Sequence, residues 1–131
     1  MVKPNIIKPR FPDRKISETF FDFASPILNP ILELDDFEIV KEHAEKALEI
    51  ASLVWNSVVL DVTNGDNKNV AEIRSTLASQ PGPAFMVEQL IFRKYEKFAN
   101  DNRLIGNYEF IQRKGQWRLR AESRDPTPQQ K

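Results

Sequence analysis

The chain has 131 residues, a length typical of one domain. It contains no cysteine, which excludes disulfides, thiolate metal ligands and cysteine nucleophiles. Its 19 basic and 19 acidic residues cancel, and no apolar run reaches the roughly 18 residues of a membrane span. The first ten residues lack the apolar stretch of a signal peptide, so we expect a cytoplasmic protein without a membrane partner.

Charge is distributed unevenly along the chain. Residues 1–16 carry five basic and one acidic side chain, residues 17–49 two basic and nine acidic, and residues 106–131 six basic and three acidic. This segregation has two interpretations, of which the first is favoured. The charges solvate the surface and attract one another within the fold, or they form a polar surface for a partner.

The two ends of the chain are rich in proline. Three prolines among scattered basic residues predict an extended basic arm over residues 1–16, because proline disfavours helix in the residue before it. Two more prolines and a polar ending predict a disordered tail over residues 125–131. A single helical domain with a C-terminal hairpin is therefore expected over residues 17–124.

The first predicted helix begins at Ser17, a suitable N-cap. The Ser25-Pro26 pair is expected to kink or restart this helix, and Asn29-Pro30 to end it. Its apolar face consists of Phe20, Phe21, Phe23, Ala24, Ile27 and Leu28.

The longest predicted helix runs from about Asp36 to Leu60. Asp35 and Asp36 suit its positive N-terminal end, and the segment 63–67, which contains Asn-Gly, is a strong stop signal. Half of its six-residue stripe is alanine, so a neighbouring helix can approach closely. The stripe consists of Val40, Ala44, Ala47, Ala51, Val54 and Val58.

Two shorter helices are predicted next. One covers residues 68–79, and the other runs from Pro83 to about Asn100 after the break at residues 80–83. The buried stripe of the first is predicted to be Val70, Ile73 and Leu77. That of the second is predicted to be Val87, Ile91, Tyr95 and Phe98, with Leu90 beside them.

Two runs near the end of the sequence, residues 107–113 and 116–122, change to the period of a strand. Lys114-Gly115 between two such runs predicts a tight hairpin, and an isolated hairpin must dock on the helices to be stable. The predicted pairs are Arg113–Gln116, Gln112–Trp117, Ile111–Arg118, Phe110–Leu119, Glu109–Arg120 and Tyr108–Ala121. The predicted fold class is α+β, mostly α: about four helices with a C-terminal antiparallel β-hairpin packed on them.

Residues suited to catalysis or metal binding are scarce. The single histidine, His43, lies among charged neighbours, with no Glu-x-x-His spacing and no Gly-x-Ser-x-Gly motif in the chain. The four glycines stand alone, so no phosphate-binding loop is present. We expect no catalytic residue, no metal and no cofactor.

The preferred functional hypothesis is a non-catalytic interaction or regulatory module, with a homodimer as one form. Phe85 and Phe92 lie seven residues apart on the last predicted helix, off its buried stripe. Internal packing beside the hairpin is the favoured interpretation, and an apolar seam for a partner protein or a second copy is the other. The candidate partner-binding residues are Phe85, Phe92, Arg93, Lys97, Arg118 and Arg120.

One alternative is nucleic-acid binding through the hairpin and the basic arm. Basic side chains could neutralise phosphates and an aromatic ring could stack on a base. The pI of about 6.6 argues against it, and Trp117 is expected on the apolar face. The hairpin residues concerned are Arg113, Lys114, Arg118, Arg120 and Arg124.

A further alternative is an enzyme whose site is assembled from dispersed residues, namely Glu88, Arg93, Asp101 and Arg103. This hypothesis requires a deep polar cavity lined by titratable side chains whose pKa values are shifted.

Three stretches resemble a pattern in a set of small uncharacterised bacterial proteins. They are residues 21–28 (FDFASPIL), residues 54–59 (VWNSVV), and Arg93-Lys94 followed by Phe98, Asp101 and residues 103–105. The resemblance spans about residues 17–124. It implies a standalone domain and brings no activity, cofactor or catalytic residue.

Overall fold

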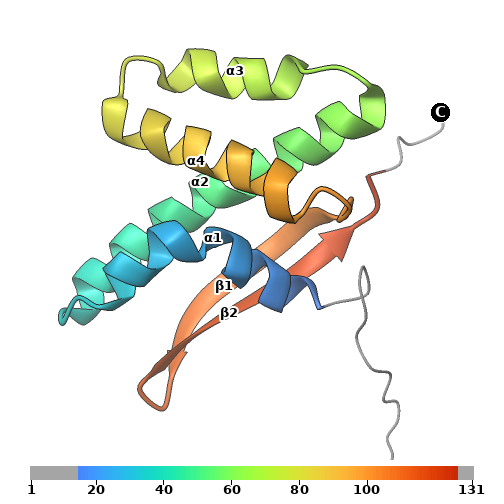
Figure 1. Cartoon of the computed structure of the whole chain (residues 1–131). Helices are drawn as coiled ribbons and strands as arrows, with labels where there is room; N and C mark the ends of the chain where they lie inside the picture. Colours follow the sequence, from blue (N-terminus) through green and yellow to red (C-terminus); the bar gives the residue numbers. More distant parts are fainter. Residues whose placement is uncertain (1–14, 127–131) are drawn as a thin grey trace, which may run out of the picture.

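Four helices precede a β-hairpin in the computed structural model, which describes residues 15–126 (Figure 1). The predicted α+β, mostly α fold is confirmed. Residues 1–14 of the predicted arm and 127–131 of the predicted tail lie outside the described residues. The elements are α1 (Ile16–Leu32), α2 (Phe37–Asn64), α3 (Lys68–Leu77), α4 (Pro81–Lys97), β1 (Leu104–Arg113) and β2 (Gln116–Arg124).

The long helix α2 lies at the centre of the fold. It packs against α1, α3, α4 and β1. In Figure 1, α2 runs obliquely across the view, with α3 at the top and the hairpin at the bottom. The predicted alanine stripe is buried, with Ala44 and Ala51 fully inaccessible and Ala47 only 3% exposed. The short side chains allow the close helix approach that the sequence predicts.

Both ends of α2 follow local rules. The Asp36 carboxylate accepts a hydrogen bond from the Ile39 amide at 3.1 Å, which confirms the predicted start. Gly65 has a φ of 73°, the left-handed conformation that glycine adopts without a steric penalty, and it ends the helix.

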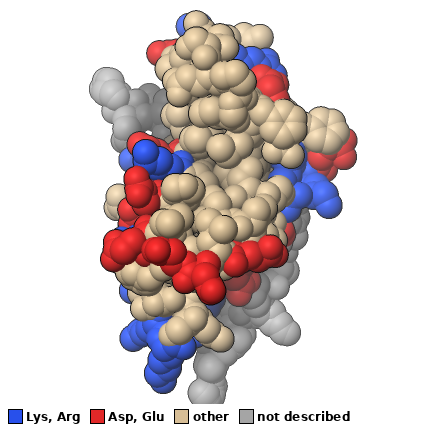
Figure 2. Space-filling view, turned by 90° about the vertical axis from the view of Figure 1, so that its left-hand side faces the viewer, with Lys and Arg blue, Asp and Glu red and all other residues tan. Residues whose placement is uncertain are grey.

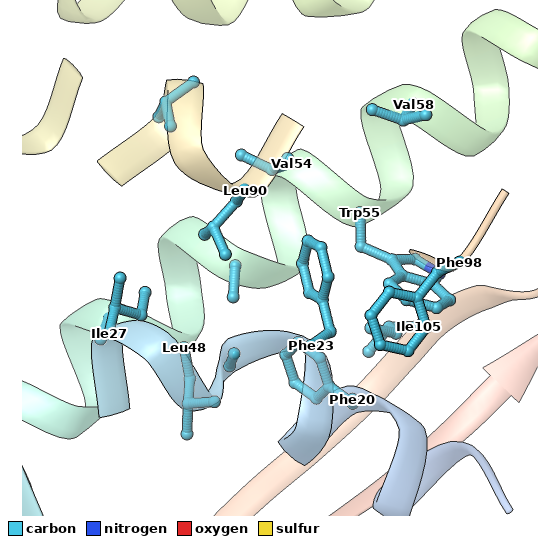
Figure 3. Packing of buried hydrophobic residues seen from close by; sticks show 14 of the residues in the cluster. Phe20, Phe23, Ile27, Leu48, Val54, Trp55, Val58, Leu90, Phe98 and Ile105 are labelled. Carbon is cyan, nitrogen blue, oxygen red and sulfur yellow. The ribbon is translucent and has the colours of Figure 1, made fainter. Parts of the chain in front are cut away.

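An aromatic cluster forms the centre of the core (Figure 3). The Phe23 ring meets the edge of Trp55 at a centroid distance of 5.1 Å and that of Phe98 at 5.7 Å. These rings come from α1, α2 and the end of α4, so one cluster joins three helices. The Trp55 indole N–H donates to the Arg103 carbonyl at 2.6 Å, which also ties the cluster to the start of β1.

Helix α1 differs from its prediction. It begins at Ile16 rather than after a Ser17 cap, and it continues through both Pro26 and Pro30 to Leu32. Pro26 lacks an amide hydrogen, so the Asp22 carbonyl one turn earlier loses its helical donor. The Ser25 hydroxyl and the Arg93 guanidinium donate to that carbonyl instead, each at 2.8 Å. The prolines are exposed, so the helix accommodates them without breaking.

The hairpin has the predicted register at all six pairs. Its turn places Lys114 and Gly115 at φ values of 52° and 77°, as a two-residue loop requires. The strands extend beyond the prediction, to Leu104 and Arg124, past an irregularity between Ile105 and Tyr108.

Side chains from two helices cover part of both outer edges of the sheet. On β1, the Asn56 side chain donates to the Ile105 carbonyl at 3.0 Å and accepts from its amide at 2.8 Å. On β2, the Ser17 hydroxyl donates to the Ala121 carbonyl at 3.2 Å and accepts from its amide at 2.9 Å. Each side chain supplies the pair of hydrogen bonds that a neighbouring strand would supply, so the predicted capping role of Ser17 is wrong and its role is in the sheet.

The buried face of α4 also differs from its prediction. The helix begins at Pro81, and Lys94 is buried where Tyr95 was expected, while Tyr95 is 48% exposed. The Lys94 ammonium donates to the carbonyls of Phe98 and Asp101 at 2.7 and 2.9 Å. It thereby ties the end of α4 to the segment that leads into β1, where the Phe98 carbonyl also accepts from the Asp101 amide at 3.1 Å. None of the helices in residues 15–126 is long and apolar enough to span a bilayer.

Candidate functional site

The outer face of α4 exposes three aromatic rings, which we call the aromatic face. Phe85, Phe92 and Tyr95 are 65%, 67% and 48% exposed. Val62, at the end of α2, is 59% exposed and lines a small cavity with Tyr95. The favoured interpretation of Phe85 and Phe92 as internal packing beside the hairpin is therefore wrong. Their exposure makes the outer face of α4 the candidate site.

An uncharged segment adjoins the aromatic face. From Ser75 to Val87, through the α3–α4 turn, the chain has no charged residue. Figure 2 looks onto the end of the molecule that carries this turn, and its upper part is largely free of charged atoms. A band of acidic side chains crosses the middle of the same view. The α1–α2 turn and the start of α2 expose four acidic residues, Glu33, Asp35, Asp36 and Glu38.

A groove of about 270 Å³ between α1 and α4 brings three predicted residues together. Phe92, Arg93 and Lys97 line it, opposite Pro26 of α1. Arg93 is 19% exposed and pairs with the Asp22 carboxylate at 3.1 Å. It also donates to the Phe23 carbonyl at 3.1 Å, so it fastens α4 to α1. Lys97 is exposed.

The other two predicted residues lie on the hairpin. Arg118 and Arg120 are exposed on β2, and α1 packs against both β2 and α4, so the hairpin and the aromatic face are separate surfaces. Arg120 pairs with Glu109 across the strands at 3.1 Å, as predicted. Trp117 stacks between Phe37 and Phe110 at centroid distances of 5.2 and 4.8 Å. Its ring faces are therefore occupied by protein.

The residues of the enzyme hypothesis make separate contacts. Glu88 pairs with Arg74 of α3 at 2.7 Å, and hydrogen bonding from that guanidinium lowers the pKa of Glu88. Asp101 is buried and pairs with Arg103 at 2.6 Å. Arg93, as described above, binds α1. These contacts lie in different parts of the fold, and each carboxylate already has a guanidinium partner.

Lys94 has the largest resolved pKa shift of the described residues. Desolvation by burial lowers the pKa of its ammonium to about 8, partly opposed by the charge of Asp101. The ammonium also lies 4.4 Å from the centroid of the Trp55 ring. A cavity of only about 20 Å³ adjoins it, too small for a substrate, so this lysine serves the structure.

Metal ligands do not converge anywhere in residues 15–126, where no group of three or more His, Asp or Glu side chains could hold an ion. No family model matches the chain, and neither a curated protein nor a solved structure gives a significant match.

Sequence reasoning missed two members of the exposed apolar surface, Tyr95 and Val62. The exposure of Tyr95 could have been predicted from its neighbour Lys94, because a lysine in the last turn of a helix is suited to bind backbone carbonyls there. Placing Lys94 inward rotates Tyr95 outward. No pattern marked Val62, since the end of α2 is apolar on nearly every side.

Proposed function

We propose that this chain is a non-catalytic interaction module that associates with a second copy of itself through the aromatic face of α4. The observation that carries the proposal is the exposure of about two-thirds of both Phe85 and Phe92 on one side of one helix. Large apolar side chains exposed together favour association. We also propose a cytoplasmic location, consistent with the absence of cysteine.

An antiparallel pairing of two α4 helices supports a homodimer over an unrelated partner. A two-fold axis beside residues 88 and 89 places Phe85 opposite the partner's Phe92. The same register places Tyr95 opposite Gly82, beside which a side-chain carbon would meet no atom within 4 Å. Glu88 lies near the axis, but Arg74 balances its charge. In this register each aromatic ring would have an apolar or small residue of the partner copy at the same level, and each Glu88 would keep Arg74 as its partner.

The aromatic face supplies part of the area that such a seam needs. An aromatic side chain buries roughly 150–250 Å². The exposed fractions of Phe85, Phe92 and Tyr95 therefore offer roughly 350 Å² per copy. Stable interfaces bury about 800 Å² per partner, with an apolar centre and a polar rim. The uncharged α3–α4 turn and the polar residues beside the rings would supply the remainder.

The test is analytical ultracentrifugation of the purified chain across a range of concentrations at low and high salt. We expect a dimer that persists in high salt, because an apolar seam is not screened. Phe92→Asp should weaken the association at least tenfold, since two carboxylates would be buried near the axis. Leu34→Asp, which changes a 48% exposed residue in the α1–α2 turn, is the matched control.

A monomer at every concentration would overturn the homodimer, as would a dimer that Phe92→Asp leaves unchanged. Circular dichroism of the variant checks that it remains folded. Arg120→Glu examines the hairpin in the same experiment, and a loss of association only in this variant would move the proposed contact from α4 to β2.

Nucleic-acid binding stays a prediction of lower rank. The basic side chains of the hairpin are exposed, but Trp117 is stacked within the protein and an acidic band lies beside the hairpin turn. Electrophoretic mobility of short single- and double-stranded oligonucleotides at low salt tests it, and no retardation would remove it.

A further inference from the structure

A groove between α2 and α3 is separate from the aromatic face and suits a small ligand. Its volume is about 360 Å³, within the range of sites for small molecules. Ile50 and Leu53 of α2 and Ile73 and Leu77 of α3 form its apolar walls. Leu53 is 49% exposed, so the groove opens to solvent along an apolar lip. No residue of α4 lines it.

Ser57 of α2 adds a hydroxyl to the wall of the groove. The residue is 6% exposed, and within the described range 15–126 its hydroxyl has no hydrogen-bond partner. Because a hydroxyl can both donate and accept, it offers a position for a polar ligand atom or a water molecule.

The charged residues that line the groove are all acidic. Glu49 and Glu72 line it, one from each helix, and none of the lining residues is basic. Both side chains are exposed, so they can attract a cation that approaches the groove from solvent. An anion would be repelled, and a neutral apolar molecule would leave the carboxylates without a counter-charge.

We propose that this groove binds a small organic amine with an apolar, ring-sized body. The body occupies the space between the apolar walls, and the ammonium is attracted to Glu49 and Glu72. The hydroxyl of Ser57 accepts or donates a hydrogen bond at the base of the groove. The proposal is independent of self-association, since it uses residues of α2 and α3 alone.

Three indoles that differ in charge test the proposal. They are tryptamine (a cation), 3-methylindole (neutral) and indole-3-propionate (an anion), each titrated into the 15N-labelled full chain and followed by amide chemical shifts. Tryptamine should shift resonances of residues 49–57 and 69–77. We expect its affinity to exceed that of 3-methylindole several-fold, with indole-3-propionate the weakest ligand.

Charge-neutralising variants identify the groups responsible. Glu72→Gln and Glu49→Gln should each weaken tryptamine binding several-fold and leave 3-methylindole binding unchanged, because they remove charge but keep size. Glu42→Gln, on the exposed side of α2, is the matched control and should change neither. Ser57→Ala should weaken tryptamine binding with less effect than either glutamate change.

Any of three results would overturn the proposal. The first is the absence of shifts at millimolar tryptamine. The second is equal affinity for all three indoles, which would indicate apolar adsorption only. The third is a set of shifts outside α2 and α3. Because Phe92 is not part of the groove, the Phe92→Asp variant should bind tryptamine with the same affinity as the unmodified chain. The titration therefore tests the groove even if the chain does not form a dimer.

Discussion

At the scale of single residues, a buried carboxylate of one helix caps the first turn of another helix. Asp61 lies in α2 and is 1% exposed. Its two oxygens accept hydrogen bonds at 2.9 Å from the amides of Asn69 and Val70 and from the Asn69 side chain. These amides are the free donors of the first turn of α3. The residue just before α3, Asn67, makes no side-chain cap.

Asp61→Ala should therefore destabilise the protein by roughly 2–3 kcal/mol, because buried amides lose a charged acceptor. Urea denaturation measures the loss. Asp66→Ala is the matched control, since its exposed carboxylate accepts one bond from the Lys68 amide at 3.3 Å. We expect that control to cost about 0.5 kcal/mol. Equal costs for the two changes would show that Asp61 does not hold α3.

Lys94 makes stability depend on pH in the alkaline range. Burial lowers its pKa from 10.5 to about 8 in the folded protein. Below pH 8 both states are protonated, and the folded state bears the cost of a buried charge. Between pH 8 and 10.5 the folded protein releases the proton first, so the cost is relieved and stability rises with pH.

Lys94→Met removes this titration while keeping a similar volume. The free energy of unfolding of the unmodified chain, relative to that of the variant, should rise by up to about 3 kcal/mol over this range. Urea denaturation of both proteins at a series of pH values measures the difference. Parallel pH curves would contradict a lowered lysine pKa.

At the scale of elements, a proline in one helix creates the binding site for an arginine of another. Pro26 frees the Asp22 carbonyl, and Arg93 of α4 donates to it at 2.8 Å. Arg93→Met should cost about 1–3 kcal/mol, because this bond and the pair with the Asp22 carboxylate are part-buried.

Pro26→Ala supplies an amide that restores the helical donor to the Asp22 carbonyl. In that background the cost of Arg93→Met should fall by about 1 kcal/mol. Chemical denaturation of the four proteins of this double-mutant cycle measures the coupling. Additive costs would mean that the proline and the arginine act independently.

At the scale of the whole molecule, most of the fold could be predicted from period and turn chemistry. The hairpin register follows from a two-residue turn and strict alternation, and α2 follows from an alanine-rich stripe with clear end signals. The predictions are wrong where a side chain that is distant in the sequence supplies a hydrogen bond that local rules assign to a neighbouring residue. Helix α1 continues through Pro26, and the carbonyl that this proline frees is bound by Ser25 and by Arg93, which lies 67 positions after Pro26. Rules that consider only neighbouring residues do not include a contact of this range.

The candidate site could be predicted only in part. Phe85 and Phe92 were identifiable as residues off the buried stripe, but whether another element covered them was a tertiary question. Tyr95 was assigned to the core because a charged lysine at the neighbouring position was assumed to face solvent. To predict the α2–α3 groove, one must know the packing angle between the two helices. The sequence pattern of a single helix does not contain that angle.

The pairing of Ser17 with Ala121 and of Asn56 with Ile105 has a consequence for synthesis of the chain. These contacts join residues 104 and 49 positions apart. While the chain emerges from the ribosome, the side chain of Asn56 lacks its partner until β1 has been made, and that of Ser17 lacks its partner until β2 has been made. The helices alone would present an unfinished core to proteases and chaperones. A chain stopped before β1 should therefore be cleaved faster by proteases than the full chain, because its helices lack the contacts that the hairpin supplies.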